Sequence, residues 1–211
     1  MGPRRSEVAV GGEETTGQQL DAVARSHLWA HGWECRHGIG HGVGSYLHVH
    51  EGPQRFSKTN DVALELGMVS SCEPGVYLEG AFGVRLENTI ATVPSSTTAF
   101  GPFYAFETLT LCPFDRNLIE TEMLTAEEHT WLDTYHRTVR QALKAHLGPD
   151  EVRWLEGRTR PLLPRTDSGS EAPCIVSMMR IPYGASTRPS RRHCARVTGY
   201  ARVAHGSARN S

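Results

Sequence analysis

Apolar residues recur at helical spacing in two segments of the chain. The first is residues 16–32, where Gly32 follows the last apolar position and indicates the end of a helix. The second begins at Thr125 with the spacing of a capping box and ends before Gly148. A short third helix is expected over residues 150–155. We expect the second helix to pack into the core through one apolar stripe: Trp131, Leu132, Tyr135, Val139 and Leu143.

Between these helices the pattern changes to the period of two that is typical of strands. The clearest alternation covers residues 83–93, and it carries Glu87 on the polar face. Glu73 ends an earlier strand, just before the Pro74-Gly75 pair. If the two strands are antiparallel neighbours, the two carboxylates converge. Helices and antiparallel strands together predict an α+β fold. Further strands are expected over residues 46–49, 67–73, 76–79 and 106–112.

Composition divides the 211 residues into three regions. Residues 1–13 are polar and Gly-rich and predict a flexible leader, and residues 14–163 predict a folded body. Residues 164–211 are rich in Arg, Ser and Pro and predict a disordered tail. From position 160 onward, nine arginines and two acidic residues give a charge of +7, which leaves −8 for the rest. The net charge of −1 therefore conceals an acidic body and a basic tail.

Several classes of protein are excluded by the same composition. No apolar run approaches the roughly 20 residues that a membrane helix needs, and no apolar stretch near residue 1 resembles a signal peptide. The five cysteines form no CxxC pair, which favours a reducing compartment, and we expect the cytoplasm. The basic tail suggests a nucleic-acid-binding arm, but it lacks lysine and has few aromatic residues, so we expect no nucleic-acid partner. A frame-shifted tail is the other alternative.

Histidines give the strongest chemical signal. Six of the 11 lie between His27 and His50, in a Gly-rich segment. His37 and His41 are four residues apart, and the glycines around them let the backbone approach a site closely. In an extended segment, His48 and His50 would share one face.

Three interpretations of these residues remain open on composition alone. An imidazole with two carboxylates suits Mn²⁺, Co²⁺, Zn²⁺ or Fe²⁺. Two carboxylates also serve as acid and base without a metal. Histidines and strand glutamates are otherwise common on solvated surfaces.

Four motifs in fixed order resemble the C-terminal half of the pita-bread (creatinase/aminopeptidase) metallopeptidases, and most of all the cytosolic Xaa-Pro aminopeptidases. The match continues through FETLTLCP at residues 106–113 and the helix that follows, and covers about residues 16–163. The resemblance implies a curved antiparallel sheet with flanking helices, so that residues 14–163 are part of a catalytic domain. The four motifs are HGIGHGVG at residues 37–44, VHEGP at 49–53, LGMVSSCEPG at 66–75 and FGVRLEN at 82–88.

The resemblance also implies a site for two divalent metal ions, usually Mn²⁺, with Zn²⁺ or Co²⁺ as alternatives. The metal ligands that it assigns in this sequence are His41, Glu73 and Glu87. The implied reaction removes the N-terminal residue from peptides with proline at position two. Paired metal ions suit this reaction because they activate water and polarise the scissile carbonyl.

Four residues are expected to have catalytic roles. Chemical reasoning gives Glu73 the proton of the attacking water in addition to its role as a ligand, and the resemblance matches His37 to a substrate-binding histidine. His50 stabilises the tetrahedral intermediate, and Arg85 orients the second glutamate ligand. The expected partner is a peptide substrate, with neither a membrane nor a nucleic acid involved.

The resemblance departs from this sequence in one respect. The family uses two further Asp ligands on strands upstream of the first histidine motif, whereas Asp21 is the only aspartate before His37 and lies in a predicted helix. We therefore expect a truncated fragment with negligible activity alone. The alternatives are a non-catalytic peptide-binding module and a half-enzyme completed by a partner chain or by homo-oligomerisation.

Overall fold

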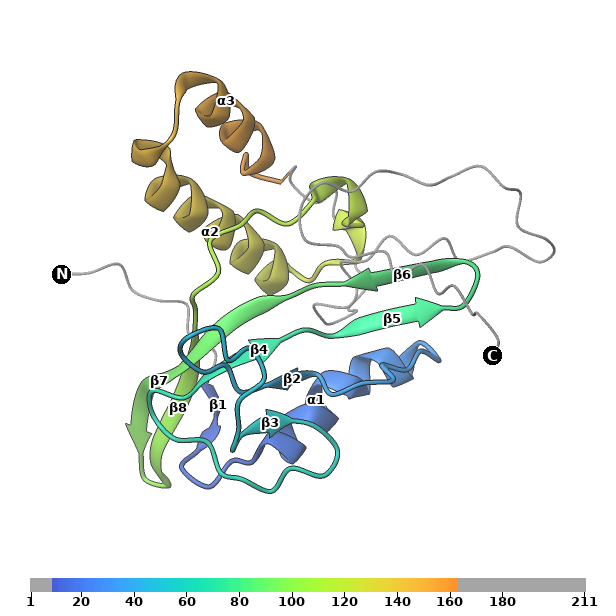
Figure 1. Cartoon of the computed structure of the whole chain (residues 1–211), viewed down its shortest axis with the longest axis vertical. Helices are drawn as coiled ribbons and strands as arrows, with labels where there is room; N and C mark the ends of the chain where they lie inside the picture. Colours follow the sequence, from blue (N-terminus) through green and yellow to red (C-terminus); the bar gives the residue numbers. More distant parts are fainter. Residues whose placement is uncertain (1–8, 163–211) are drawn as a thin grey trace.

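Figure 1 shows a computed structural model of the chain, which describes residues 9–162. The predicted tail, residues 164–211, and residues 1–8 of the predicted leader lie outside the described part. The helices are α1 Gly17–Ala30, α2 Ala126–Leu143 and α3 Pro149–Arg158, with 3₁₀ turns at Arg116–Leu118, Thr121–Met123 and Lys144–His146. The strands are β1 Ala9–Gly12, β2 Gly40–His41, β3 Arg55–Phe56, β4 Val69–Cys72, β5 Gly75–Leu78, β6 Phe82–Arg85, β7 Asn88–Thr98 and β8 Gly101–Thr108.

All strand pairs are antiparallel. The largest sheet has the order β1-β8-β7-β4, and β2-β3 and β5-β6 form two smaller sheets. In Figure 1, α2 and α3 lie above the β5-β6 hairpin and α1 lies below it. The expected α+β class, with flanking helices around an antiparallel sheet, is confirmed. Residues 9–12, which the sequence analysis assigned to the leader, instead form β1, because they pair with β8.

One long hairpin carries both predicted glutamates. Cys72 pairs with Asn88 in the large sheet and Gly75 pairs with Arg85 in the β5-β6 sheet, so the register is continuous and Glu73 lies opposite Glu87. The expected single strand over residues 83–93 is therefore divided into β6 and β7. Only one backbone hydrogen bond joins the strands at this point: Leu86 N–H donates to Pro74 O at 3.2 Å, and Pro74 has no N–H to return it. The Glu73 N–H faces away from β7 and donates to Ile39 O at 2.7 Å.

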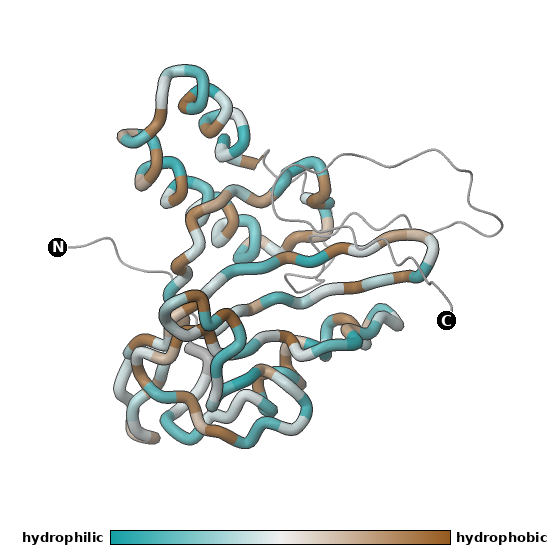
Figure 2. Tube along the Cα trace, in the orientation of Figure 1, coloured by the Kyte–Doolittle hydropathy of each residue, from teal (hydrophilic) through white to brown (hydrophobic). Residues whose placement is uncertain are grey.

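Among the described residues, the buried apolar side chains form two separate cores. One lies under the hairpin and joins α1 to the strands through Leu28, Ile39, Phe56, Val76 and Ile90. The other joins α2 to α3, and the predicted stripe contributes to it through Leu132, Tyr135 and Val139. Figure 2 shows the alternation of hydrophobic and hydrophilic residues along the hairpin that separates these cores.

The capping residues define the helix ends as predicted. Thr16 and Thr125 each form a capping box, at the start of α1 and of α2. Gly32 follows α1 with φ +72°, the left-handed conformation that glycine adopts without strain. Within residues 9–162, none of the helices is both long and apolar enough to cross a membrane.

The expected strand at residues 46–49 is wrong. Tyr46 and Leu47 have φ of 54° and 65°, so the chain reverses there, and Gly44 N–H donates to His48 O at 2.8 Å. His48 is consequently largely exposed and lies 3.5 Å from Glu51, whereas His50 returns toward the site. The two histidines do not share a face, because a turn lacks the period of two.

Candidate active site

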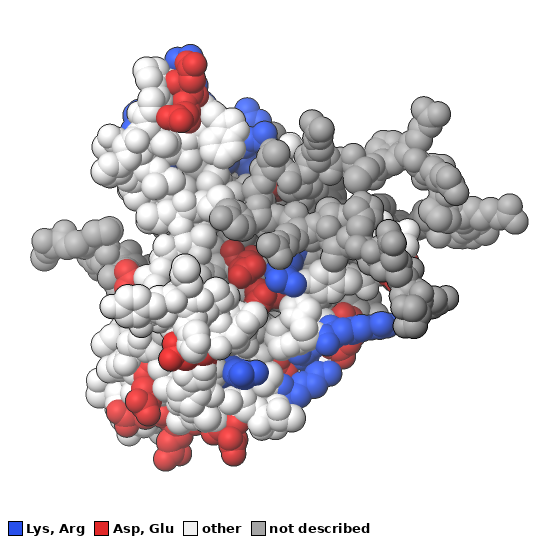
Figure 3. Space-filling view, viewed as in Figure 1, with Lys and Arg blue, Asp and Glu red and all other residues white. Residues whose placement is uncertain are grey.

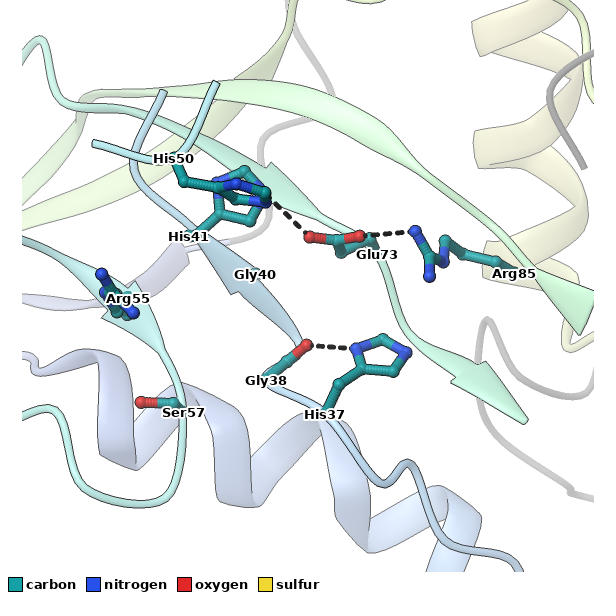
Figure 4. A pocket seen from close by; sticks show the side chains of 9 residues that line it. All are labelled: His37, Gly38, Gly40, His41, His50, Arg55, Ser57, Glu73 and Arg85. Carbon is teal, nitrogen blue, oxygen red and sulfur yellow. Dashed lines mark hydrogen bonds and ion pairs between the residues drawn. The ribbon is translucent and has the colours of Figure 1, made fainter. Parts of the chain in front are cut away.

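Glu73 occupies the centre of the site, where it is almost fully buried. Its Oε1 accepts a hydrogen bond from the Ser71 hydroxyl at 3.0 Å and lies 3.0 Å from His41 Nε2. Its Oε2 accepts from Arg85 Nη1, also at 3.0 Å. Figure 4 shows this arrangement, with residues from β2 and β6 on either side of the carboxylate. Both oxygens are therefore held in one orientation by neighbouring strands.

The contacts of the two ring nitrogens of His41 indicate which of them carries the proton. Its Nδ1 lies 2.9 Å from Gly42 O, so Nδ1 carries the proton and Nε2 has a lone pair in the neutral ring. That lone pair faces a carboxylate oxygen, so two acceptors stand 3.0 Å apart. Such a contact is favourable only when a proton or a metal ion lies between the two acceptors. The imidazole and carboxylate are ligands for borderline divalent ions, and the Gly42 carbonyl is a typical orienting partner for a ligating histidine.

β2 approaches β4 closely enough for this contact because residue 40 is glycine. A Cβ at Gly40 would lie 2.0 Å from Ser71 O. The His41 backbone N–H also donates to Ser71 Oγ at 3.0 Å. Any larger residue at position 40 would push β2, and with it His41, away from Glu73.

His37 and His50 flank this pair. The His50 ring packs edge-on against the His41 ring with centroids 4.2 Å apart. His37 Nδ1 donates to Gly38 O at 2.7 Å, and its Nε2 lies 3.1 Å from the Tyr77 hydroxyl. The side-chain interaction with Cys35, together with the Gly38 carbonyl, raises the pKa of His37 against the effect of burial.

Tyr77 connects His37 to Arg85, and sequence reasoning missed it. Arg85 Nε donates to the Tyr77 hydroxyl at 2.8 Å. Burial lowers the pKa of Arg85, but Tyr77 and the nearby carboxylates outweigh it and raise the pKa overall. Tyr77 lies two positions after Gly75 in an extended strand, so the period of two along β5 was the signal that would have found it.

Glu87 stands apart from the other predicted ligands. Its nearest described partner is Arg85, whose Nη1 is 4.0 Å from Glu87 Oε2, and 43% of its side chain is exposed. The guanidinium thus lies between the two opposed carboxylates and reduces their repulsion. Within residues 9–162, no group of three or more His, Cys, Asp or Glu side chains is placed to hold a metal ion. The structure brings His41 and Glu73 together and leaves Glu87 outside their contact.

A buried guanidinium on α1 holds the segment that leads to His37. Arg25 is 2% exposed, and it pairs with Asp21 at 2.7 Å and with Glu34 at 2.7 Å. It also donates to the carbonyl of Cys35, and to that of His37 at 2.6 Å. Sequence reasoning placed Asp21 in a helix but did not identify this network.

The residues converge on a pocket of about 370 Å³. Figure 3 shows acidic side chains gathered at the lower end of the molecule and a mixed acidic and basic group near its middle. The pocket includes five of the six predicted site residues, with Glu87 outside it. It is lined by His37, Gly38, Gly40, His41, His50, Arg55, Ser57, Glu73 and Arg85.

Two family models match most of the described part of the chain. Residues 8–94 match the model of metallopeptidase family M24, and residues 102–162 match the model of the C-terminal region of the same family. The chain belongs to metallopeptidase family M24. The resemblance to Xaa-Pro aminopeptidases that the four motifs indicated is confirmed by the relatives of this M24 chain.

Two curated relatives and one solved structure illustrate the likeness. The chain is 45% identical over 156 residues to "Probable Xaa-Pro aminopeptidase P" of Colletotrichum graminicola, covering 70% of this chain and 25% of that protein. It is 38% identical over 167 residues to Xaa-Pro aminopeptidase 2 of Homo sapiens, covering 77% and 25%. The X-prolyl aminopeptidase of Caenorhabditis elegans, described as a cytosolic enzyme with a di-nuclear active site, has 33% identity and a TM-score of 0.68, covering 74% of this chain and 26% of that one. The M24 chain thus spans about a quarter of the length of these relatives, and its fold is the C-terminal portion of the pita-bread architecture.

Proposed function

We propose that this chain contributes to a metal-dependent aminopeptidase that removes the N-terminal residue from peptides with proline at position two. The observation that carries the proposal is the contact between His41 Nε2 and Glu73 Oε1, two acceptors that require a cation or a proton between them. The names of the relatives support the reaction, and the description of the C. elegans enzyme supports a pair of metal ions.

The residues of this chain fit part of such a metal site. His41 and Glu73 would hold a divalent ion, Mn²⁺ being the metal usual in the family, with Glu87 as a further ligand. The ions supply Lewis-acid activation of water and of the scissile carbonyl. The two Asp ligands that the resemblance implies would come from chain outside these motifs, or from a partner chain that complements it. We also propose a cytoplasmic location, which the description of the C. elegans enzyme as cytosolic supports.

The remaining residues orient the reacting groups. Glu73 is held by Ser71 and Arg85, so its carboxylate can take a proton from the attacking water without changing rotamer. His37, fixed by Tyr77, would present its ring to the substrate, and His50 would donate to the developing oxyanion. A proline at position two has no amide N–H, so recognition relies on shape and on the carbonyl.

Hydrolysis of Ala-Pro-Ala in the presence of Mn²⁺ tests the proposal. The chain alone is expected to show negligible turnover, and co-expression with a segment that carries two Asp ligands is expected to produce it. Glu73→Gln in the complemented enzyme should lower kcat by a factor of at least 100, as expected for loss of a ligand and proton acceptor. Glu79→Gln is the matched control, because Glu79 is exposed in the β5-β6 turn.

Two results would contradict the proposal. One is full turnover by the Glu73→Gln enzyme. The other is tight binding of the peptide by the chain in excess EDTA with no turnover after complementation, which would indicate a non-catalytic peptide-binding module.

A further inference from the structure

We propose that Arg55 is a specificity-determining residue that binds a carboxylate of the peptide substrate. This inference rests on the proposed function, because it takes the His41–Glu73 pair as the place of bond cleavage. It adds the substrate class: short peptides whose carboxylate lies one or two residues beyond the scissile bond. The argument depends on strand register, on the partners of Arg55, and on the charges in the pocket.

The register of β2 and β3 places Arg55 beside the site. Arg55 pairs directly with His41 in this antiparallel sheet. Side chains that are directly opposite in such a pair stand on the same face, with Cβ atoms about 4.5–5.5 Å apart. The Arg55 side chain therefore lies on the face from which His41 reaches Glu73, and both residues line the pocket. Figure 4 shows Arg55 and Arg85 on opposite sides of the His41–Glu73 pair.

The backbone of Arg55 is held by neighbouring residues, whereas its guanidinium is available to bind a ligand. Its N–H donates to Asn60 Oδ1 at 3.1 Å, and its carbonyl lies against Gly17, where a Cβ would be 1.8 Å from the oxygen. Among residues 9–162, the guanidinium has neither an ion-pair partner nor a side-chain hydrogen bond. Arg85, by contrast, is already committed to Glu73 and Tyr77. Arg55 is thus an exposed cation on a fixed backbone, and the described residues leave its hydrogen-bonding capacity unused.

The charges of the pocket favour an anionic group at this position. Among the Arg, Lys, Asp and Glu side chains that line the pocket, Arg55 and Arg85 exceed the single carboxylate of Glu73 by one positive charge. A short peptide has a positive amino terminus and a negative carboxyl terminus, so Arg55 repels one end and attracts the other. An extended chain advances about 3.3–3.6 Å per residue, so a carboxylate one or two residues past the scissile bond falls within reach of an arginine side chain beside His41. The planar guanidinium suits a carboxylate in particular, because it donates two parallel hydrogen bonds.

Calorimetric binding of three peptides in the presence of Mn²⁺ tests this inference and separates the two sources of carboxylate. The peptides are Ala-Pro-Ala, its C-terminal amide, and the C-terminal amide of Ala-Pro-Glu, and turnover is followed in the same solutions. The variant is Arg55→Gln, which removes the charge at similar length. The control is Arg137→Gln, because Arg137 is an exposed arginine on α2 outside the pocket.

Arg55→Gln is expected to weaken binding of the free acid by roughly 3- to 10-fold, as for a partly exposed charge pair, and to leave the simple amide unchanged. A matching loss for the Ala-Pro-Glu amide extends the inference to acidic side chains, whereas no loss there restricts it to the terminal carboxylate. If the wild-type chain binds all three peptides and Arg55→Gln binds the free acid equally well, this inference alone is overturned. If the wild-type chain neither binds nor cleaves any of them, even after complementation, the proposed function fails and this inference fails with it.

Discussion

A single guanidinium, that of Arg25, fixes the segment that leads from α1 into the site. It pairs with buried Asp21 and donates to the His37 carbonyl, so the position of the His37 backbone depends on a residue 12 positions earlier. The buried pair requires both partners, since removal of one leaves an uncompensated charge in the core. Arg25 is therefore a positioning residue for His37.

Arg25→Lys is expected to lower the free energy of unfolding by about 2 kcal/mol, because lysine keeps the charge but loses the forked set of donors. It should also shift the ring resonances of His37 in an NMR titration. Arg137→Lys, an exposed substitution, should change neither quantity. Unchanged stability and unchanged His37 resonances in Arg25→Lys would contradict the positioning role.

At this scale the sequence identified the residues that carry reactive groups and one residue that holds them, Arg85, but not the others. His41 and Glu73 stand out through their motifs, and the structure places them in contact. Tyr77, Ser71 and Arg55 act across strands, so their contacts depend on register and on which strands are neighbours. A pattern within one strand gives the face of a residue but not the identity of its cross-strand partner.

Among the elements, the helices follow their local signals more closely than the strands do. Capping boxes at Thr16 and Thr125 define the helix starts because their hydrogen bonds are local. The interruption between β6 and β7 was not predicted, because it depends on Pro74, which lies across the hairpin from Leu86 and has no N–H to donate. The turn at Tyr46 was missed because a non-glycine residue with positive φ has no sequence signature there.

Helix α2 contains a buried histidine with a strongly altered titration. His136 is fully buried, and its Nε2 accepts the Phe114 N–H at 3.2 Å, so Nδ1 carries the proton and has no partner among the described residues. Burial, followed by the charge of Arg116, lowers the pKa of His136 to about 4. The folded protein therefore favours the neutral form of the His136 ring.

Protonation of His136 is therefore expected to destabilise the folded protein in acid. The pKa in the folded state is depressed below the ordinary value of 6.5, so the stabilisation is present above pH 6.5 and is lost as the pH falls toward 4. Between pH 7 and pH 5 the free energy of unfolding should fall by about 2 kcal/mol from this residue. Urea unfolding of wild type and His136→Gln at both pH values measures this fall in the free energy of unfolding. An equal pH dependence in the two proteins would refute the assignment, and His146→Gln, at an exposed position, serves as the control.

In the molecule as a whole, Tyr135 links the α2-α3 core to the long hairpin. Tyr135 belongs to the α2-α3 core, and its hydroxyl lies 2.6 Å from Cys112 O and 3.2 Å from Asn88 Oδ1. Burial raises the pKa of Tyr135 to about 12, so it remains a hydrogen-bond donor at physiological pH. Asn88 directly follows Glu87, so the second core holds the hairpin near the site without contributing residues to the pocket.

Mn²⁺ binding to the folded chain is the most direct test of the central claim, that His41 and Glu73 form part of a metal site. Calorimetry on wild type, His41→Asn and Glu73→Gln, with Glu79→Gln as the control, compares the dissociation constants at pH 7.5. We expect each of the two site variants to bind Mn²⁺ at least tenfold more weakly than wild type, because each loses one of two converging ligands. Equal dissociation constants in all four proteins would show that a proton, and not a metal ion, stands between His41 and Glu73.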